Sequence, residues 1–305
     1  MDYIMETNGL TKMYGSKAAA KDINIHIREG EVYGLIGRNG AGKTTIMRML
    51  SGLSNPTSGT FTMFGKTGNE AKKLMHQVGV LIEHPGLYPR LSARENLKIK
   101  SIALGIKDSA KQIDEIIELV GLENTGKKPC GSFSLGMRQR LGIALAVLGQ
   151  PKLIILDEPI NGLDPQGIVE VRKMLETLRD EKKITIMISS HILEELEKLA
   201  DSYGIIHEGL IIDEFSTEKF TKKCGQFVTI KTSNNEKTVE LLKKSGFKDV
   251  SIDNDHNIRV GEALKDTAKM AKSIVNANID LNEMIITNTS LEDYYLSVTG
   301  GKHNG

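Results

Sequence analysis

A glycine-rich loop that ends in Lys-Thr-Thr constrains the fold of this chain more than any other stretch. Residues 37–45, GRNGAGKTT, fit the pattern G-x-x-x-x-G-K-[ST]. The apolar residues at 31–36 predict a short strand before this loop, and residues 45–50 begin a helical pattern after it. A strand, a tight loop and a helix in this order are typical of phosphate-binding loops. The sequence therefore predicts an α/β fold built around such a loop.

The residue types of the loop suit a nucleoside triphosphate. Gly37, Gly40 and Gly42 let the backbone curl tightly and approach the phosphates closely. The following helix points unpaired N–H groups and its positive dipole end at the same place. We expect Lys43 to reach the β- and γ-phosphates and the Thr44 hydroxyl to bind Mg²⁺. The alternative is a glycine-rich turn with a solvated lysine.

Composition and charge argue against several other functions. The formal net charge of the 305 residues is +1, so nothing favours nucleic acid or an anionic membrane surface as the main partner. Aromatic residues are few and tryptophan is absent, which disfavours a stacking surface for single strands. The N-terminus does not resemble a signal peptide, and all apolar runs are far shorter than the ~20 residues that span a bilayer. We expect a chain that does not cross a membrane by itself.

Further candidate site residues lie at the ends of predicted elements. Ser134 is a good N-cap for the helix after it, and the start of that helix is a second candidate anion-binding site. The apolar run 153–156 is typical of a buried parallel strand and ends at Asp157 and Glu158, where open α/β sheets bind ligands. His191 closes another buried strand. Considered alone, it is more typical of a hydrogen-bonded core or turn histidine.

The element pattern predicts two domains. Within residues 1–217 strands and helices alternate, and a helix is expected to start at Ser92, where Glu95 completes a capping box. Two N-terminal strands are expected, at Tyr3–Thr7 and Lys21–Ile27. Tyr14 lies between them, and spacing alone predicts a half-buried strand residue. From residue 218 to 305 a strand–helix–strand–strand–helix–strand pattern without a catalytic constellation predicts a small α+β accessory domain.

Taken together, these stretches resemble the nucleotide-binding subunit of an ATP-binding cassette (ABC) transporter over about residues 3–215. The resemblance implies a P-loop NTPase fold, namely a RecA-like core with a helical subdomain at about residues 88–150. It identifies the glycine-rich loop as the Walker A motif that binds ATP. The residues of that motif are Gly37, Arg38, Asn39, Gly40, Ala41, Gly42, Lys43, Thr44 and Thr45.

The resemblance also implies roles for residues outside the loop. Tyr14 would stack on the adenine. Ser134 and Gly136 belong to the signature motif, which in the family binds the γ-phosphate of ATP held by a partner subunit. Asp164 would belong to the D-loop at the dimer seam.

Three further residues would carry the reaction, together with Lys43. Asp157 ends the Walker B strand and would position Mg²⁺, and Glu158 would be the general base. His191 would be the switch histidine that contacts the γ-phosphate.

The sequence departs from the usual family pattern at two places. The signature reads FSLGM at residues 133–137 instead of LSGGQ, and Glu83 stands where glutamine is usual. Both features, and the tail at 290–296, resemble the subgroup linked to bacitracin and lantibiotic self-protection. A carboxylate at Glu83 can still bind Mg²⁺ or couple to the membrane subunit. Alternatively, Glu83 is a solvated loop acid.

The resemblance implies an ATPase that uses ATP and Mg²⁺, works as a homodimer and powers separate integral membrane permease subunits. Such a subunit would be cytoplasmic and peripheral on the inner face of the cell membrane. Export of an antimicrobial peptide, or resistance to one, is the expected role, and no nucleic acid partner is expected. One alternative is a soluble ABC ATPase that acts on DNA or ribosomes. Another is a P-loop kinase or GTPase, which would leave residues 134–136 and His191 unexplained.

Overall fold

The computed structural model describes residues 3–253, 256–261 and 264–300. The chain divides into two units, Met1–Ser216 and Thr217–Gly305, one residue before the boundary expected from the sequence. Residues 1–2 and 301–305, which the two expected domains include, lie outside the described residues. Within the described part, no helix is both long and apolar enough to cross a bilayer.

A six-stranded sheet forms the centre of the first unit, in the order β11–β10–β4–β9–β8–β7, and all its neighbours are parallel except β10 and β11. Every residue of β4, β8 and β9 is buried, as expected for a parallel sheet covered on both faces. The carboxyl ends of these three strands meet at one edge, where the candidate site residues follow. The strands are β4 (Val32–Ile36), β7 (Val78–Leu81), β8 (Leu153–Asp157), β9 (Thr185–Ser190), β10 (Ser202–His207) and β11 (Leu210–Ser216).

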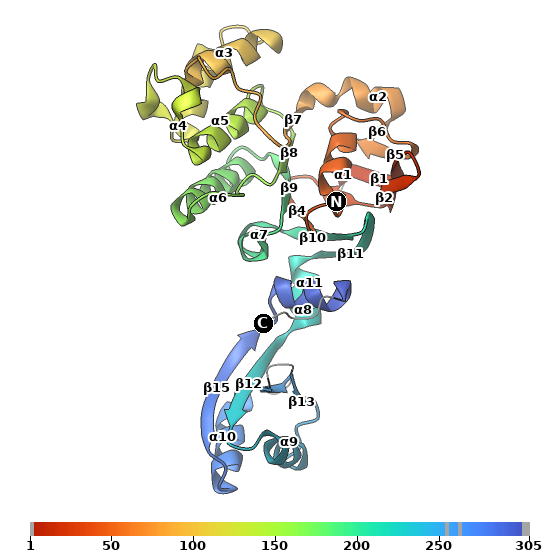
Figure 1. Cartoon of the computed structure of the whole chain (residues 1–305), viewed down its shortest axis with the longest axis vertical. Helices are drawn as coiled ribbons and strands as arrows, with labels where there is room; N and C mark the ends of the chain where they lie inside the picture. The colour runs from red at the N-terminus through yellow and green to blue at the C-terminus, as the bar shows by residue number, and fades with distance from the viewer. Residues whose placement is uncertain (1–2, 254–255, 262–263, 301–305) are drawn as a thin grey trace. The chain divides into compact units, whose positions relative to one another are not determined.

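The helices of the first unit include a helical part beside the central sheet, formed by α3, α4 and α5 (Figure 1). The capping box predicted at Ser92 and Glu95 starts α3, and Ser134 caps α5, so both predictions are confirmed. The helices are α1 (Lys43–Leu50), α2 (Gly68–Lys73), α3 (Ala93–Ala103), α4 (Ala110–Leu119), α5 (Leu135–Val147), α6 (Pro165–Asp180) and α7 (Leu193–Leu199). Short 3₁₀ turns occur at Met75–Gln77, Glu123–Thr125 and Cys130–Ser132.

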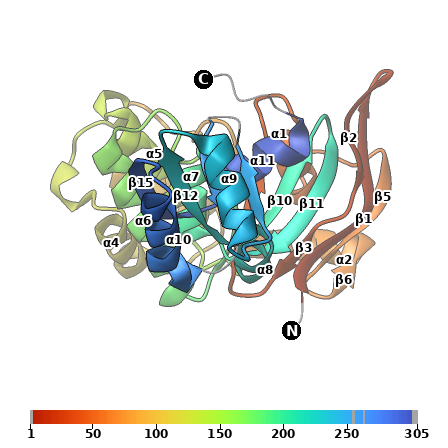
Figure 2. The same ribbon diagram turned by 90° about the horizontal axis from the view of Figure 1, so that it is seen from below.

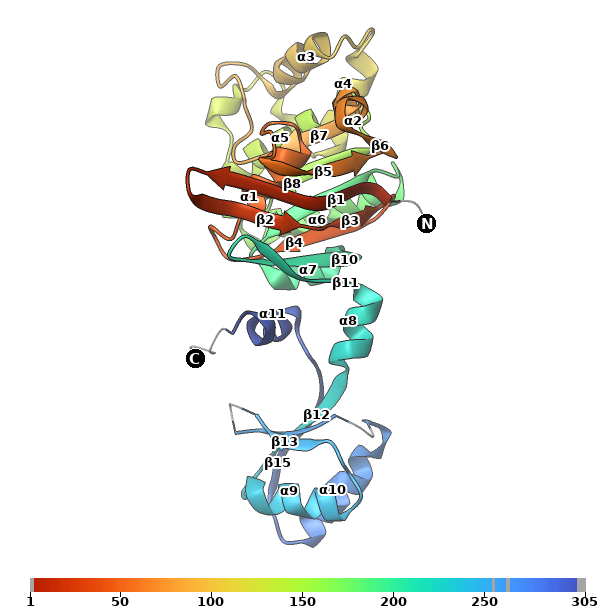
Figure 3. The same ribbon diagram turned by 90° about the vertical axis from the view of Figure 1, so that its right-hand side faces the viewer.

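α1 has the central sheet on one side and an antiparallel sheet on the other (Figures 1 and 3). The order of the antiparallel sheet is β2–β1–β5–β6, and β3 also pairs with β1. Its strands are β1 (Tyr3–Tyr14), β2 (Lys17–Ile23), β3 (His26–Arg28), β5 (Ser58–Met63) and β6 (Lys66–Thr67). Apolar side chains of β1, α1 and the central sheet share one core, including Met5, Met47 and Ile155. The helix that follows the glycine-rich loop is therefore held between two sheets.

Three N-terminal predictions are wrong. The first strand does not end at Thr7 but continues to Tyr14, because β1 pairs with β5 and β3 along its first half and with β2 along its second. The expected strand Lys21–Ile27 is split into β2 and β3, and Asp22 has a positive φ of 51° just before the break. Tyr14 is 53% exposed instead of half-buried, because it lies at the end of the β1–β2 hairpin.

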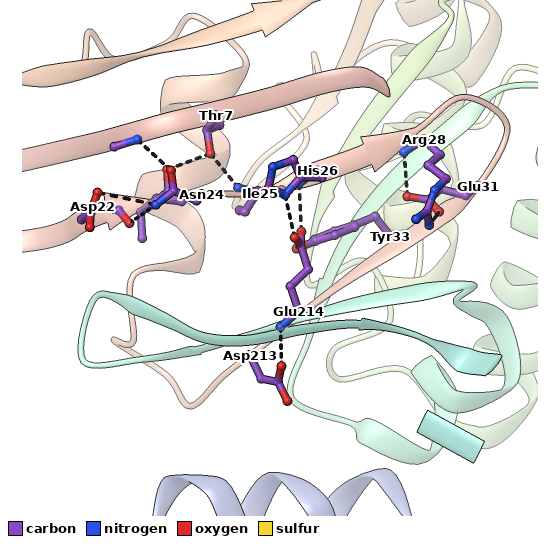
Figure 4. A network of polar contacts seen from close by, with 12 residues as sticks. Thr7, Asp22, Asn24, Ile25, His26, Arg28, Glu31, Tyr33, Asp213 and Glu214 are labelled. Carbon is purple, nitrogen blue, oxygen red and sulfur yellow. Dashed lines mark hydrogen bonds and ion pairs between the residues drawn. The ribbon is translucent and has the colours of Figure 1, made fainter. Parts of the chain in front are cut away.

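Glu214 of β11 ties together three strands of the first unit (Figure 4). Its Oε1 accepts hydrogen bonds from the His26 backbone N–H at 2.8 Å and from the Tyr33 hydroxyl at 2.9 Å. Its Oε2 lies 2.7 Å from His26 Nδ1. Burial, together with the negative charge of Glu214, raises the pKa of Tyr33 well above its usual value. Tyr33 therefore stays a neutral donor, and Glu214 links β11 to β3 and β4.

The second unit has a four-stranded antiparallel sheet in the order β13–β14–β12–β15, with α9 and α10 side by side on one face (Figures 2 and 3). This βαββαβ arrangement is ferredoxin-like. Its core includes Val228, Ile230, Leu242 and Ile274. The elements are α8 (Thr217–Cys224), β12 (Gln226–Thr232), α9 (Asn235–Lys244), β13 (Val250–Ile252), β14 (Ile258–Val260), a 3₁₀ turn (Leu264–Asp266), α10 (Thr267–Asn276), β15 (Leu281–Asn288) and α11 (Leu291–Thr299).

Candidate functional site

The loop between β4 and α1 needs glycine for two separate reasons. Gly42 caps α1 with φ 114°, a conformation that residues with a side chain rarely adopt. A Cβ at Gly42 would also lie 2.5 Å from the carbonyl oxygen of Ala19. Gly37 has an ordinary φ, but a Cβ there would lie 2.6 Å from the carbonyl oxygen of Ile206. The loop is therefore both tightly curled and closely packed on its neighbours.

Lys43 is the first residue of α1, and its side chain is only 5% exposed. Its ammonium donates to the carbonyl oxygens of Gly37 at 2.6 Å and Arg38 at 3.3 Å. It also lies 3.1 Å from Oε1 of Glu158. A buried ammonium needs such partners, because an unpaired buried charge is very unfavourable. These contacts fix the lysine at the mouth of the loop.

The Asp157 carboxylate, at the end of β8, is held by two hydroxyl groups. The Thr44 hydroxyl donates to its Oδ2 at 2.6 Å, and the Ser189 hydroxyl donates to its Oδ1 at 2.6 Å. The Ser189 oxygen accepts a hydrogen bond from the Glu158 backbone N–H at 2.9 Å. The ends of β8 and β9 and the start of α1 therefore meet at one acid.

Glu158 follows Asp157 and has a positive φ of 50°, which is uncommon for a residue other than glycine. Its Oε2 lies 2.8 Å from His191 Nδ1, and its Oε1 faces Lys43. The Glu158 side chain is 20% exposed, so it retains access to solvent. The carboxylate thus lies between a lysine and a histidine that come from two other elements.

A pocket of about 490 Å³ opens over the loop and Glu158. One side of this pocket is formed by the start of β2 and the turn between β10 and β11, and the sequence did not predict it. That turn is attached to the loop by a hydrogen bond from the Gly209 N–H to the Ala41 carbonyl at 2.9 Å. No local sequence pattern pointed to these residues. The lining consists of Lys17, Ala18, Ala19, Arg38, Asn39, Gly40, Gly42, Lys43, Thr44, Thr45, Glu158, Glu208 and Gly209.

Ser134 and Gly136 do not line this pocket. They lie at the start of α5 in a second pocket of about 400 Å³, which Asp164 also lines. The Ser134 hydroxyl oxygen accepts from the Met137 N–H at 3.2 Å, and Asp164 accepts from the Gly167 N–H at 3.0 Å. Each therefore caps a helix, and the two helix starts face one pocket.

Tyr14 and Glu83 also lie outside the lining of the loop pocket. The exposed Tyr14 ring has the Lys12 ammonium 5.3 Å from its centre. Glu83 follows β7, is exposed, and pairs with Arg48 of α1 at 2.8 Å. The structure therefore brings Lys43 together with Glu158, but Tyr14 and Glu83 do not line the same pocket.

Comparison with known proteins supports the resemblance seen in the sequence. A family pattern described as "ABC transporter" matches residues 20–161. The bacitracin transport ATP-binding protein BcrA of Bacillus licheniformis is 45% identical over 303 residues, which cover 99% of each chain. The chain belongs to the ATP-binding proteins of ABC transporters. The lantibiotic transport ATP-binding protein SrtF of Streptococcus pyogenes is 47% identical over 69% of this chain and 90% of that protein.

The fold of this ABC ATP-binding protein agrees with solved cassettes. The structure of cbiO1 from Clostridium perfringens, part of the ABC transporter complex cbiONQ, has a TM-score of 0.64 and 30% identity. The match covers 73% of this chain and 92% of the cbiO1 chain. The predicted P-loop NTPase fold and ATPase activity are confirmed, and the relatives do not support the alternative of an ATPase for DNA or ribosomes.

Proposed function

We propose that this ATPase powers separate integral membrane permease subunits, and that the complex exports an antimicrobial peptide such as bacitracin or a lantibiotic, or confers resistance to it. The full-length similarity to a bacitracin transport protein supports the substrate class. In this proposal the chain is cytoplasmic and peripheral on the inner face of the membrane. Nucleic acid has no part in it, and the unit from Thr217 onward is an accessory domain.

The observation that carries the catalytic proposal is the position of Glu158 between Lys43 and His191. Glu158 would act as the general base that accepts a proton from water as the water attacks the γ-phosphate. Lys43 would bind the β- and γ-phosphates, and His191 would contact the γ-phosphate. The partial exposure of Glu158 supports this role, because the base must reach a water molecule.

The residues around Asp157 fit a magnesium ion. The Thr44 hydroxyl and the Asp157 carboxylate are 2.6 Å apart and are the oxygen ligands that Mg²⁺ prefers beside phosphate oxygens. When bound, Mg²⁺ would neutralise charge that develops on the phosphates. Glu83 is proposed as a further ligand or as the coupling contact to the permease. Its ion pair with Arg48 supports a tie to α1 but leaves the solvated acid as the alternative.

Two copies of the chain would be needed to complete each nucleotide site. The Ser134 and Gly136 helix start lies in a different pocket from the glycine-rich loop of the same chain. We therefore propose a head-to-tail homodimer in which ATP on one loop contacts this helix start in the second copy. Tyr14, which is exposed, would stack on the adenine.

The substitution Glu158→Gln tests the proposed reaction. The variant should bind ATP but lose about 10²- to 10⁴-fold in turnover, because the amide cannot accept the proton. Closed dimers should accumulate with ATP, which size-exclusion chromatography with light scattering would detect. Glu29→Gln, an exposed position in the turn before β4, is the matched control and should keep full activity. Wild-type turnover in Glu158→Gln would refute the assignment of the base.

The permease proposal has its own test. Affinity purification of the full chain from its native membrane should recover a polytopic membrane protein in a fixed ratio. The ATPase activity of that complex should respond to bacitracin or a lantibiotic, as coupled transporters respond to their substrates. Copurification of nucleic acid in place of a membrane protein would contradict the proposal.

A further inference from the structure

Ser189 contacts both Asp157, the last residue of β8, and Glu158, which follows it, through the same atom. Its Oγ donates to Asp157 Oδ1 at 2.6 Å and accepts from the Glu158 N–H at 2.9 Å. Ser189 lies directly opposite Asp157 in the parallel register of β8 and β9 and is completely buried. Both hydrogen-bonding directions of the hydroxyl are therefore used on two adjacent residues.

The two hydrogen bonds of Ser189 hold the Asp157 carboxylate and the Glu158 backbone in place. A short hydroxyl-to-carboxylate hydrogen bond is charge-assisted and strong, so it fixes the rotation of the Asp157 carboxylate. Thr44 holds the other oxygen of that carboxylate. The second bond anchors the Glu158 backbone where its φ is positive, a conformation that persists only when its surroundings hold it.

We propose that Ser189 is a positioning residue that aligns the Asp157 carboxylate for Mg²⁺ and the Glu158 carboxylate for water through one hydroxyl group. This inference rests on the proposed roles of Asp157 and Glu158. In this proposal Ser189 acts only through Asp157 and Glu158, to which its hydroxyl is bonded. Loss of its hydroxyl leaves a buried carboxylate oxygen and a backbone N–H short of a partner, and both residues lose their fixed orientation.

The test compares Ser189→Ala with Ser189→Thr in the full-length chain. Alanine should lower turnover by about ten- to a hundredfold, as expected for the loss of a residue that orients a metal ligand. Threonine keeps the hydroxyl and suits a β-strand, so it should restore most of the activity. Ser101→Ala is the matched control. Ser101 is also completely buried, but it lies in α3 and bonds to Lys98 and Ser109.

Binding of the non-hydrolysable analogue AMP-PNP, measured by calorimetry with Mg²⁺ and with EDTA, gives a readout that does not depend on turnover. In Ser189→Ala the affinity for AMP-PNP in Mg²⁺ should fall about tenfold, while the affinity in EDTA stays at the wild-type value. The ratio of the two affinities should therefore fall about tenfold. Wild-type turnover, or an equal loss of affinity with and without Mg²⁺, would overturn the proposal, because the second result indicates only a damaged fold. A wild-type chain that does not hydrolyse MgATP would instead refute the proposed function, and the two affinities would still test Ser189.

Discussion

The bond between Tyr33 and Glu214 makes a sharp prediction about the stability of the first unit. Tyr33→Phe removes one 2.9 Å hydrogen bond to a carboxylate and changes little else, because the ring stays fully buried. A hydrogen bond to a charged group contributes about 1.5–3 kcal/mol. The Glu214 side chain is 25% exposed and keeps its two contacts with His26, so we expect a loss at the low end of this range, about 1.5–2 kcal/mol at pH 7.

The stability lost in Tyr33→Phe should become smaller as the pH rises. The pKa of Tyr33 is raised in the folded protein by burial and by the charge of Glu214, while in the unfolded chain it stays at about 10. Below that value the protonated Tyr33 contributes its full stability. Above it, only the unfolded chain gives up the proton, and the contribution falls by about 1.4 kcal/mol per pH unit until the folded pKa is reached. Tyr33→Phe should therefore cost less at pH 11 than at pH 7.

Urea unfolding of the full chain, followed by circular dichroism, measures both effects. Tyr203→Phe is the control, since Tyr203 is equally buried and donates to the neutral Ala200 carbonyl at 3.2 Å. Tyr203→Phe shows which unfolding transition belongs to the first unit. It should lower the stability of that unit by about 0.5–1.5 kcal/mol at pH 7. An unchanged urea midpoint in Tyr33→Phe at pH 7, or a cost that grows toward pH 11, would refute the reasoning.

Two further predictions concern the loop and Glu83. Gly42→Ala should abolish ATP binding and lower the melting temperature strongly, because its Cβ would meet the Ala19 carbonyl oxygen at 2.5 Å in addition to the strain of φ 114°. Gly40→Ala should lower the melting temperature less, because its Cβ meets nothing within 4 Å and only the positive φ of 81° is strained. Calorimetry with ATP and a thermal melt check both, and equal effects of the two variants would contradict the geometry. Glu83→Gln should retain ATP hydrolysis, because Glu83 is exposed and an amide still accepts from Arg48. A complete loss of ATPase activity would show that the carboxylate is essential.

Features set by a few neighbouring residues could be predicted without coordinates. The glycine-rich loop, the buried strand before Asp157 and the caps at Ser92 and Ser134 were all found correctly. Each depends on local hydrogen bonding, burial periodicity or backbone freedom, which a short stretch of chain encodes. The roles of Asp157, Glu158 and His191 depended on a resemblance and remain proposals.

Other features depend on strands that are distant in the sequence. The register that sets Ser189 opposite Asp157, the β10–β11 turn against the loop and the exposure of Tyr14 all arise from sheet pairing. The failed prediction of a short first strand has the same origin, since β5 and β2 pair with β1 beyond Thr7. Local patterns indicate which residues can form a strand, but the partner and the register are chosen by packing across the whole sheet. For this reason the residue types of the site could be read along the chain, whereas their contacts required the folded molecule.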